Sequence, residues 1–448
     1  MERSMAYLTR DLAEHIHCSL RDGLPADVNE VAMKCLLDLI GAAIAGYDMP
    51  GPKAARSIAG TLFGTGAVPV WLSGTTVAPL AALHCNAAAA SALDLDDGSR
   101  AARGHPGAAV IPTAFAALPQ ADGSASELIA AVALGYDVGI RIASAQNPEG
   151  IKTRQTGRWA AFAAAATAGR LLKSPPHVIA QALSIAGVLA PNQQANGSSG
   201  YSLLTGNDVK EGIAWSAATG LAALSLAIND HTGPEDILDH PGYYDASRIR
   251  QGLGQRFEII DTYFKPYACC RYIHPALDAF FEVMGERRID AAHIRRIEVE
   301  TFAWALKLGN QLEPDNLVAL QYSLPYCLAV AALEGKDALA PVGNSLLGRP
   351  DLSRFAGRVS LKVHPDIDGL FPAQTLARVV IETPTATYTS NINAPFGDPK
   401  RPMTWSDIEG KFNRVTRDRL SRERQKALID GVLNLASGDL DGLMLALR

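Results

Sequence analysis

The segment FKPYACCRYIHP, residues 264–275, separates two regions of different character. Before it, alanine and leucine recur at helical spacing between turns rich in Gly, Pro and Asn. After it, helical stretches alternate with short runs of β-branched residues. The segment itself combines a lysine, an arginine, a histidine, two cysteines and two tyrosines with two prolines. Because ligand clefts form preferentially at domain boundaries, this concentration of reactive groups marks a candidate site.

The region before residue 264 is predicted to form a helical domain. Long stretches carry apolar residues with helical periodicity at 28–47, 125–145, 159–172 and 209–228. Their high content of Ala and Gly predicts closely packed helices, because small side chains let neighbouring backbones approach.

The region after residue 264 is predicted to form a smaller α+β domain. Helical periodicity continues at 274–290 and 315–338. Alternating β-branched and polar residues predict half-buried strands at 295–302, 357–366, 377–383 and 385–392. We expect these strands to pair antiparallel.

The last part of the chain is predicted to return to the helical domain. Prolines end the strand region in FGDPKRPMTWSDIEGKF, residues 396–412, where Thr404 or Ser406 would cap a new helix. The fold class is therefore mostly α with an inserted α+β domain. The boundaries are 1–263 and 400–448 for the helical domain, and 264–399 for the α+β lid domain.

Composition narrows the functional classes. With 448 residues, 48% hydrophobic, 19% charged and a net charge of -5, the chain is typical of a soluble protein of two domains. It has no basic stretch for nucleic acid, no signal peptide and no uninterrupted apolar run for a membrane span. Its six cysteines lack a C-x-x-C pair, so neither zinc nor disulfides are expected. A cytoplasmic location is the prediction, and an anionic ligand would need local cations.

A second cluster of chemistry lies in SALDLDDGSRAARGHPG, residues 91–107. One interpretation is an acidic turn that is simply solvated. The other is that Asp94, at the end of an apolar helix, points inward and orients His105 as an acid or base near neutral pH. Pro106 is suited to the first turn of a following helix, whose N-terminus would favour a carboxylate.

The order and spacing of several blocks resemble the MmgE/PrpD family along nearly the whole chain. The blocks are KCLLDLIGAAIAG (34–46), ALDLDD (92–97), GHPGAAVIP (104–112), TGRWAAFAAAATAGRLL (156–172), HTGPEDIL (231–238), FKPYACCRYIHPALDA (264–279), LQYSLPYCLAVAAL (320–333) and GDPKRPM (397–403). The family includes 2-methylcitrate dehydratases, cis-aconitate decarboxylases and iminodisuccinate epimerases. The resemblance implies an active site between a helical domain and an inserted lid, a homodimer, and neither a metal nor an organic cofactor.

The resemblance also implies a set of site residues. The catalytic positions suggested in decarboxylase relatives fall on Asp94, His105, Lys265, Cys269, His274, Tyr322 and, with a register uncertain by one residue, Lys210. Relatives often read F-H-x-T-G where this chain has Arg154 in place of the histidine. An arginine adds a permanent cation whose fork matches a carboxylate.

Among the family's activities, the chain most resembles the iminodisuccinate epimerases. That substrate has four carboxylates on two aspartate-like halves joined by nitrogen, so we expect a cation-rich pocket using Lys265, Arg271, Arg154 and Lys210, with Tyr267 and Cys269 as further contacts. Epimerisation needs a base and an acid on opposite faces of the carbon. We expect His105, oriented by Asp94, to face Lys265 or His274 across the cleft.

Two alternatives stay open at this stage. The first is a hydro-lyase acting on 2-methylcitrate or a similar tricarboxylate with the same base. The second is a non-catalytic protein that binds carboxylates. Elimination of the amine and its re-addition would also epimerise iminodisuccinate.

Overall fold

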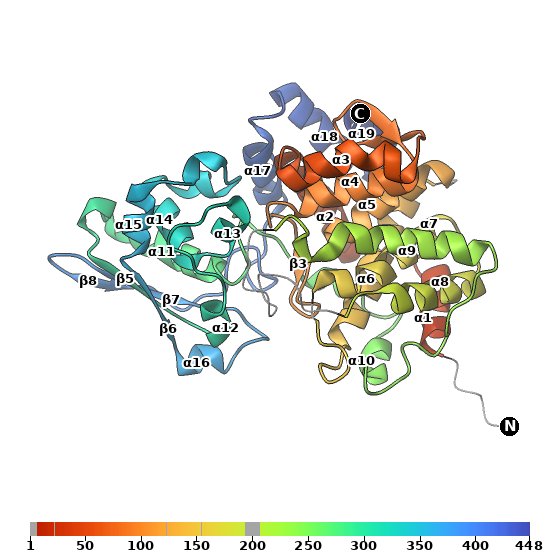
Figure 1. Cartoon of the computed structure of the whole chain (residues 1–448), viewed down its shortest axis with the longest axis horizontal. Coiled ribbons are helices and arrows are strands. Elements are labelled where there is room, and N and C mark those ends of the chain that lie inside the picture. Colours follow the sequence, from red (N-terminus) through yellow and green to blue (C-terminus); the bar gives the residue numbers. More distant parts are fainter. Residues whose placement is uncertain (1–6, 22, 122, 154, 193–206) are drawn as a thin grey trace.

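The computed structural model describes residues 7–448 except positions 22, 122, 154 and 193–206. Two parts lie side by side in Figure 1: a larger helical part, and a smaller part in which helices accompany a sheet. The larger part combines segments from both ends of the chain, and the smaller part is made by the residues between them. The predicted fold class, mostly α with an inserted α+β unit, is confirmed.

The helices of the larger part that precede residue 264 include all four long helices predicted from periodicity. They are α1 (Leu8–Cys18), α2 (Ala26–Gly46), α3 (Pro50–Phe63), α4 (Pro79–Ser91), α5 (Gly107–Ala117), α6 (Ala125–Ser144), α7 (Ala160–Leu171), α8 (Pro176–Leu189), α9 (Ile213–Ile228) and α10 (Ala246–Arg250). Short antiparallel pairs join β1 (Val68–Val70) to β2 (Thr75–Val77) and β3 (Gly98–Ser99) to β4 (Thr262–Tyr263).

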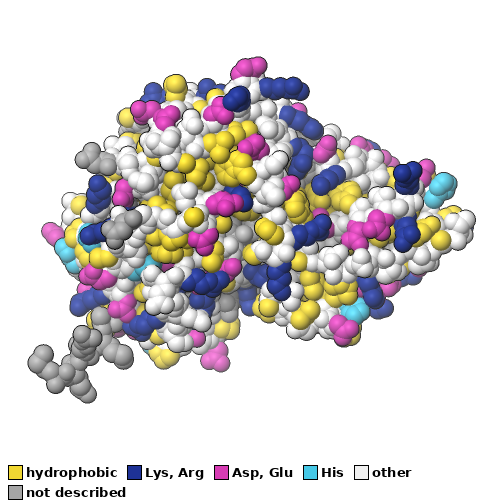
Figure 2. Space-filling view, turned by 180° about the vertical axis from the view of Figure 1, so that it is seen from behind, with side chains coloured by type: hydrophobic (Ala, Val, Ile, Leu, Met, Phe, Trp, Pro, Cys, Tyr) yellow, Lys and Arg dark blue, Asp and Glu magenta, His cyan; other side chains and the backbone are white. Residues whose placement is uncertain are grey.

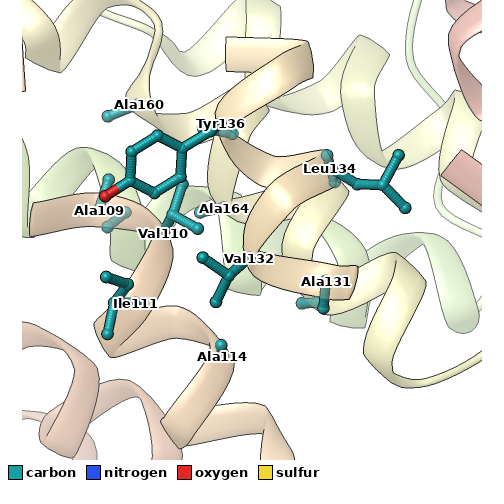
Figure 3. Close-up of a cluster of buried hydrophobic side chains, with 14 of the residues drawn as sticks. Ala109, Val110, Ile111, Ala114, Ala131, Val132, Leu134, Tyr136, Ala160 and Ala164 are labelled. Atoms are coloured by element: carbon teal, nitrogen blue, oxygen red, sulfur yellow. The ribbon is translucent and has the colours of Figure 1, made fainter. Parts of the chain in front are cut away.

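Small side chains hold the centre of the larger part together. Figure 3 shows Ala109 and Val110 of α5, Val132 of α6, and Ala160 and Ala164 of α7 packed around one another. All of these side chains are buried. Because alanine adds almost no width to a helix, α5, α6 and α7 pack closely, and the loops at their ends are held firmly.

The smaller part contains a four-stranded sheet with strand order β6-β5-β7-β8. Its strands are β5 (Arg296–Thr301), β6 (Val359–Val363), β7 (Arg378–Glu382) and β8 (Thr387–Thr389), and its helices are α11 (His274–Arg287), α12 (Ala303–Leu306), α13 (Leu317–Gln321), α14 (Leu324–Leu333), α15 (Pro350–Ala356) and α16 (Pro365–Asp368). The expectation of purely antiparallel pairing is wrong, because β5 and β6 run parallel, with Val299 opposite Leu361. The other two pairs are antiparallel.

Three further helices return to the larger part, as Figure 1 shows. They are α17 (Trp405–Thr416), α18 (Arg422–Asn434) and α19 (Asp441–Ala446). Thr404 caps α17 in a reciprocal box with Asp407, which confirms Thr404 as the cap. Phe412 of α17 and Val432 of α18 are buried in the same hydrophobic core as α2.

One helical stretch, Lys210–Ile228, is long and apolar enough by length and composition to cross a membrane, although the sequence was expected to contain no such span. Half of it is buried inside the protein, and a core helix passes the same test.

On the face shown in Figure 2, cationic and acidic side chains are interspersed. No single sign of charge dominates that face.

Candidate active site

A cavity lies where the two parts of the molecule meet, with about 110 Å³ of free space. Its wall carries Asp94, the histidine and the two arginines of the 91–107 segment together with residues of the smaller part. The lining residues are Asp94, Ser99, Arg100, Arg103, Gly104, His105, Glu211, Tyr263, Cys270, Arg271, Tyr272, Leu308, Tyr322, Phe371, Pro372 and Thr375. Acidic, cationic and aromatic groups thus converge in one concave space, as expected of a small-molecule site.

Asp94 is the acidic centre of this wall. It follows α4 in a left-handed conformation with φ of 52°, and the residue is only 1% exposed. Its Oδ1 lies 2.9 Å from Lys265 Nζ, 3.4 Å from Lys210 Nζ and 3.5 Å from His105 Nε2. Burial alone would raise the pKa of Asp94, but the charges of Lys210 and Lys265 outweigh burial and lower it. Asp94 is therefore a permanent carboxylate.

His105 is held in place by both glycines of the GHPG motif. A Cβ at Gly104 would lie 2.4 Å from Thr156 Oγ1, and one at Gly107 would lie 2.3 Å from Asp97 Oδ1, so only glycine allows these approaches. The backbone N–H of His105 donates to Thr156 Oγ1 over 3.1 Å. His105 Nδ1 lies 3.1 Å from the Asp97 carbonyl oxygen. Donation of Nδ1–H to that carbonyl leaves Nε2, on the Asp94 side, as the atom that takes or gives a proton.

Lys265 lies one layer behind the cavity wall. It is fully buried, and its Nζ donates to the carboxylate and, over 3.0 Å, to the backbone carbonyl of Asp94. The same Nζ is 3.3 Å from His105 Nδ1. Burial would lower the pKa of Lys265, but the charges of Asp94 and Asp96 raise it further. Lys265 is therefore a fixed ammonium that supports Asp94 and His105.

The expected arrangement of acid and base across the cleft is not what the geometry gives. With 3.3 Å between Lys265 Nζ and His105 Nδ1, no substrate carbon fits between these two groups. They form one side of the site. Any proton donor on the opposite face has to come from another residue of the wall.

A metal site is the other interpretation of the acidic residues near His105. Within the described part of the chain, Asp94, Asp96 and His105 offer ligand atoms that all lie within 4.8 Å of one another. Two ammonium groups already contact the Asp94 carboxylate, however, and their charge opposes a divalent cation. This donor set therefore fits an ion-pair network better than it fits a metal.

Comparison with known proteins agrees with this architecture. Residues 10–252 match the MmgE/PrpD N-terminal domain, and residues 267–436 match the MmgE/PrpD C-terminal domain. The chain belongs to the MmgE/PrpD family. Cis-aconitate decarboxylase from Aspergillus terreus is 26% identical over 448 residues, which cover 92% of this chain and 90% of the decarboxylase. Cis-aconitate decarboxylase-like protein oryM from Aspergillus oryzae is 24% identical, with 94% and 93% of the two chains covered.

Two cations of the 264–275 segment were expected at this MmgE/PrpD site, and Arg271 is the one that lines the cavity. Arg271 is 5% exposed and lies over the ring of Tyr263, 4.6 Å from its centroid. Its Nη1 donates to the carbonyls of Phe264 and Phe396 over 3.3 and 3.2 Å. Its Nε is buried without a partner among the described residues. Arg271 is thus a rigidly held cation with a donor to spare.

Lys210 and Tyr322 form a second layer next to Asp94. The Tyr322 ring lines the cavity, and its hydroxyl accepts a hydrogen bond of 3.2 Å from Lys210 Nζ. Lys210 does not line the cavity. It begins a run of three left-handed residues before α9, because φ is 43° at Lys210, 58° at Glu211 and 70° at Gly212. The helix predicted from residue 209 therefore starts only at Ile213.

Three residues expected at the family site lie elsewhere. His274 is fully buried, 3.1 Å from the carbonyl oxygen of Cys269, and burial together with the Arg271 charge lowers its pKa. Tyr267 donates to Asp278, and Cys269 is enclosed in the core of the smaller part. None of the three lines the cavity. Arg154 falls outside the described residues.

Several residues of the wall were missed from the sequence. Cys270 lines the cavity whereas the expected Cys269 does not, and burial raises the pKa of the Cys270 thiol to about 12. Arg100 and Arg103 were visible between Asp94 and His105, but nothing in the pattern distinguished them from solvated residues. Glu211 gave no signal, since it follows a lysine within an apparently continuous helix.

Proposed function

We propose that this chain is a cofactor-independent enzyme that abstracts a proton next to a carboxylate of a polycarboxylate, and that its reaction is the epimerisation of iminodisuccinate. The observation that carries the proposal is the position of His105 on the cavity wall, beside the ion pair of Asp94 and Lys265. The lyase names of the relatives support chemistry on carboxylates in general. Epimerisation is the finer part of the proposal.

The electrostatics of the wall support proton abstraction from such a substrate. A carbanion next to a carboxylate adds charge to a group that is already anionic, so cations must be fixed where the charge develops. Arg100, Arg103 and Arg271 line the cavity. Each preorganised contact of this kind is commonly worth about 3 kcal/mol in the transition state. In our proposal His105 Nε2 takes the proton, the Asp97 carbonyl and the Asp94 carboxylate orient the ring, and Lys265 holds Asp94 in place.

The return of the proton has two routes. In direct epimerisation, an acid on the opposite face gives a proton to the same carbon, and the hydroxyls of Tyr263, Tyr272 and Tyr322 are the donors on the wall. In elimination and re-addition, the amine leaves, the alkene half turns, and the amine adds to the other face. The second route needs a proton-transfer group on only one side, and His105 on the cavity wall supplies one.

Hydro-lyase or decarboxylase activity on a tricarboxylate is the second candidate. The relatives from Aspergillus favour it, since cis-aconitate decarboxylases match over more than nine tenths of this chain. The same histidine and cations would serve that chemistry.

A single experiment distinguishes the candidates. The purified protein is given one stereoisomer of iminodisuccinate in D2O, and separately 2-methylcitrate and cis-aconitate, and proton NMR follows each reaction.

Each outcome selects one proposal. Interconversion of diastereomers with deuterium only at the α carbon supports direct epimerisation, whereas free fumarate and aspartate support elimination and re-addition. An alkene formed from 2-methylcitrate, or carbon dioxide released from cis-aconitate, would replace epimerisation by a lyase function. Binding without turnover of any substrate would indicate a carboxylate-binding protein.

We also propose that the protein works as a cytoplasmic homodimer on a small-molecule substrate, without nucleic acid. Exposed apolar residues on α3 and α9 support an interface between copies. Leu62 is 53% and Trp215 is 52% exposed, and Phe63, beside Leu62, contacts the Trp215 ring with 5.6 Å between centroids. Light scattering during size exclusion would give twice the 47.4 kDa mass of one chain. A monomer at all concentrations would contradict the proposal.

A further inference from the structure

Most charged groups of the cavity wall already have partners. Asp94 is bound by two lysines. Arg100 donates to Asp398 and Thr375, and Arg271 is bound by backbone carbonyls. Among the described residues, two charged groups of the wall have no partner or only part of their hydrogen-bonding capacity filled. The guanidinium of Arg103 has no hydrogen-bond or ion-pair partner, and Glu211 uses only one of its two carboxylate oxygens.

Glu211 is held in one position although it is not fully buried. Its Oε2 accepts hydrogen bonds from the Thr156 backbone N–H over 2.9 Å and from Thr156 Oγ1 over 2.8 Å. Thr156 Oγ1 in turn accepts from the backbone N–H of His105. The backbone of Glu211 is left-handed, a conformation that costs energy for any residue with a Cβ and is maintained mostly at functional sites. Glu211 lines the cavity, and the hydrogen bonds to Thr156 use Oε2 and leave Oε1 without a partner among the described residues.

Arg103 is the last residue of the turn between Ser99 and Gly104, which is closed by reciprocal backbone hydrogen bonds of 2.9 and 3.3 Å. Its own φ is 54°, and its side chain is exposed. Arg103 and Glu211 do not form an ion pair with each other. Both charges nevertheless reach the hydroxyl of Tyr272: burial is the main cause of its raised pKa, Arg103 opposes that rise, and Glu211 adds to it. Arg103, Glu211 and Tyr272 all line the same cavity, so a cation and an anion that are not paired with each other share its wall.

A carboxylate is an unfavourable neighbour for a substrate that carries only carboxylates. Repulsion between like charges is strong in a partly dry cavity, and the juxtaposition of two anions there disfavours binding. A substrate with an ammonium group beside a carboxylate would satisfy both free groups at once. Iminodisuccinate has such a pattern, because its secondary amine is protonated at neutral pH and is flanked by carboxylates.

We propose that Glu211 is a specificity-determining residue that binds the cationic nitrogen of the substrate through Oε1, while Arg103 binds the carboxylate next to that nitrogen. The inference rests on the proposed function for its choice of iminodisuccinate. It goes further in assigning the preference for amino-polycarboxylates over other polycarboxylates to one residue. Tricarboxylates without nitrogen, such as 2-methylcitrate, would be disfavoured by the same group.

The test compares iminodisuccinate with 2,2′-oxydisuccinate, in which an ether oxygen replaces the amine, by calorimetry at pH 7.5. Wild-type protein should bind iminodisuccinate at least tenfold more tightly. Glu211→Gln keeps an oxygen that accepts from Thr156 but loses the charge, so it should weaken iminodisuccinate at least tenfold and leave oxydisuccinate within threefold. Arg103→Gln should weaken both ligands by a similar factor.

Thr156→Val is the control for charge, because it removes the hydroxyl that donates to Glu211 and accepts from the His105 backbone N–H but keeps the Glu211 carboxylate. It should change both affinities without abolishing the preference. The inference is overturned if Glu211→Gln weakens both ligands equally or neither. If the binding preference for iminodisuccinate depends on Glu211 but the protein does not turn iminodisuccinate over, only the proposed function is overturned. If the wild type turns iminodisuccinate over and Glu211→Gln keeps the same binding preference, only this inference is overturned. If the wild type binds neither ligand, both proposals are overturned.

Discussion

Lys265 and Asp94 form an ion pair that is closed to solvent, with 2.9 Å between Nζ and Oδ1. Burial opposes both charges. Each partner nevertheless keeps its charge, because the Asp94 charge raises the pKa of Lys265 and the Lys265 charge helps to lower that of Asp94. Removal of Asp94 would leave the Lys265 charge uncompensated in the interior, and removal of Lys265 would leave Asp94 with Lys210 at 3.4 Å as its remaining cation; both changes are destabilising. The pair therefore fixes the position of the charge beside His105.

Lys265→Met should lower kcat on the order of a hundredfold or more while KM changes less than threefold. The reason is that Lys265 supports Asp94 and His105 from behind the wall and does not line the cavity. The free energy of unfolding should fall by about 3–5 kcal/mol. Steady-state kinetics and urea unfolding give the two readouts. The control, Asp94→Asn combined with Lys265→Met, should recover much of the stability and none of the turnover; a large rise in KM would instead mean that Lys265 contacts substrate.

His105→Gln should abolish exchange of the substrate α-proton with solvent, whereas His274→Gln should retain turnover within about tenfold. His105 lines the cavity, but His274 is buried against the Cys269 carbonyl. Deuterium incorporation followed by NMR measures both variants, and circular dichroism checks that each is folded. Loss of exchange in His274→Gln, with His105→Gln active, would reverse the assignment of the base.

The fold was predictable where one pattern decided it. Helical periodicity gave α2, α6 and α7, and alternation gave β5 and β7. The parallel pairing of β5 with β6 was not predictable, since alternation fixes which face of a strand is buried and leaves its neighbour open. The left-handed run before α9 was not predictable either, because lysine and glutamate rarely adopt positive φ.

The cluster of Asp94, His105 and Lys265 was predictable from the sequence, but most of the other residues that line the cavity were not. Asp94 and His105 came together because a short loop joins them, and Lys265 came with them from the far segment. In the irregular stretch from Pro266 to Ile273, no period tells which side chains face the cavity. Arg271 faces it and Tyr267 does not. Glu211 reaches the cavity from a left-handed backbone conformation, and no sequence pattern indicates that conformation.

Asp97 should make stability depend on pH. Burial, together with the charges of Asp38 and Asp96, raises its pKa to about 7, although Tyr136 donates to it. Between the ordinary aspartate pKa and that value, the folded protein binds more protons than the unfolded chain. Stability should therefore fall as pH rises through this window, by on the order of 2–4 kcal/mol in total. Asp97→Asn should flatten the slope in urea unfolding at pH 5, 6, 7 and 8; an unchanged slope would show that other groups cause it.

The ion pair between Lys411 and Asp38 should attach the C-terminal helices to the larger part. Lys411 Nζ lies 2.6 Å from Asp38 Oδ1 and donates to the Leu95 carbonyl over 2.8 Å, next to the acids beneath the cavity. Burial raises the pKa of Asp38 and lowers that of Lys411, so the pair survives only by mutual attraction. Lys411→Met alone should lower the free energy of unfolding by about 3–5 kcal/mol. The matched variant Asp38→Leu with Lys411→Met should be close to wild type, because an apolar pair of similar volume leaves no buried charge. Equal destabilisation of the two variants would mean that the hydrogen bond to Leu95, rather than the charge balance, is what the lysine contributes.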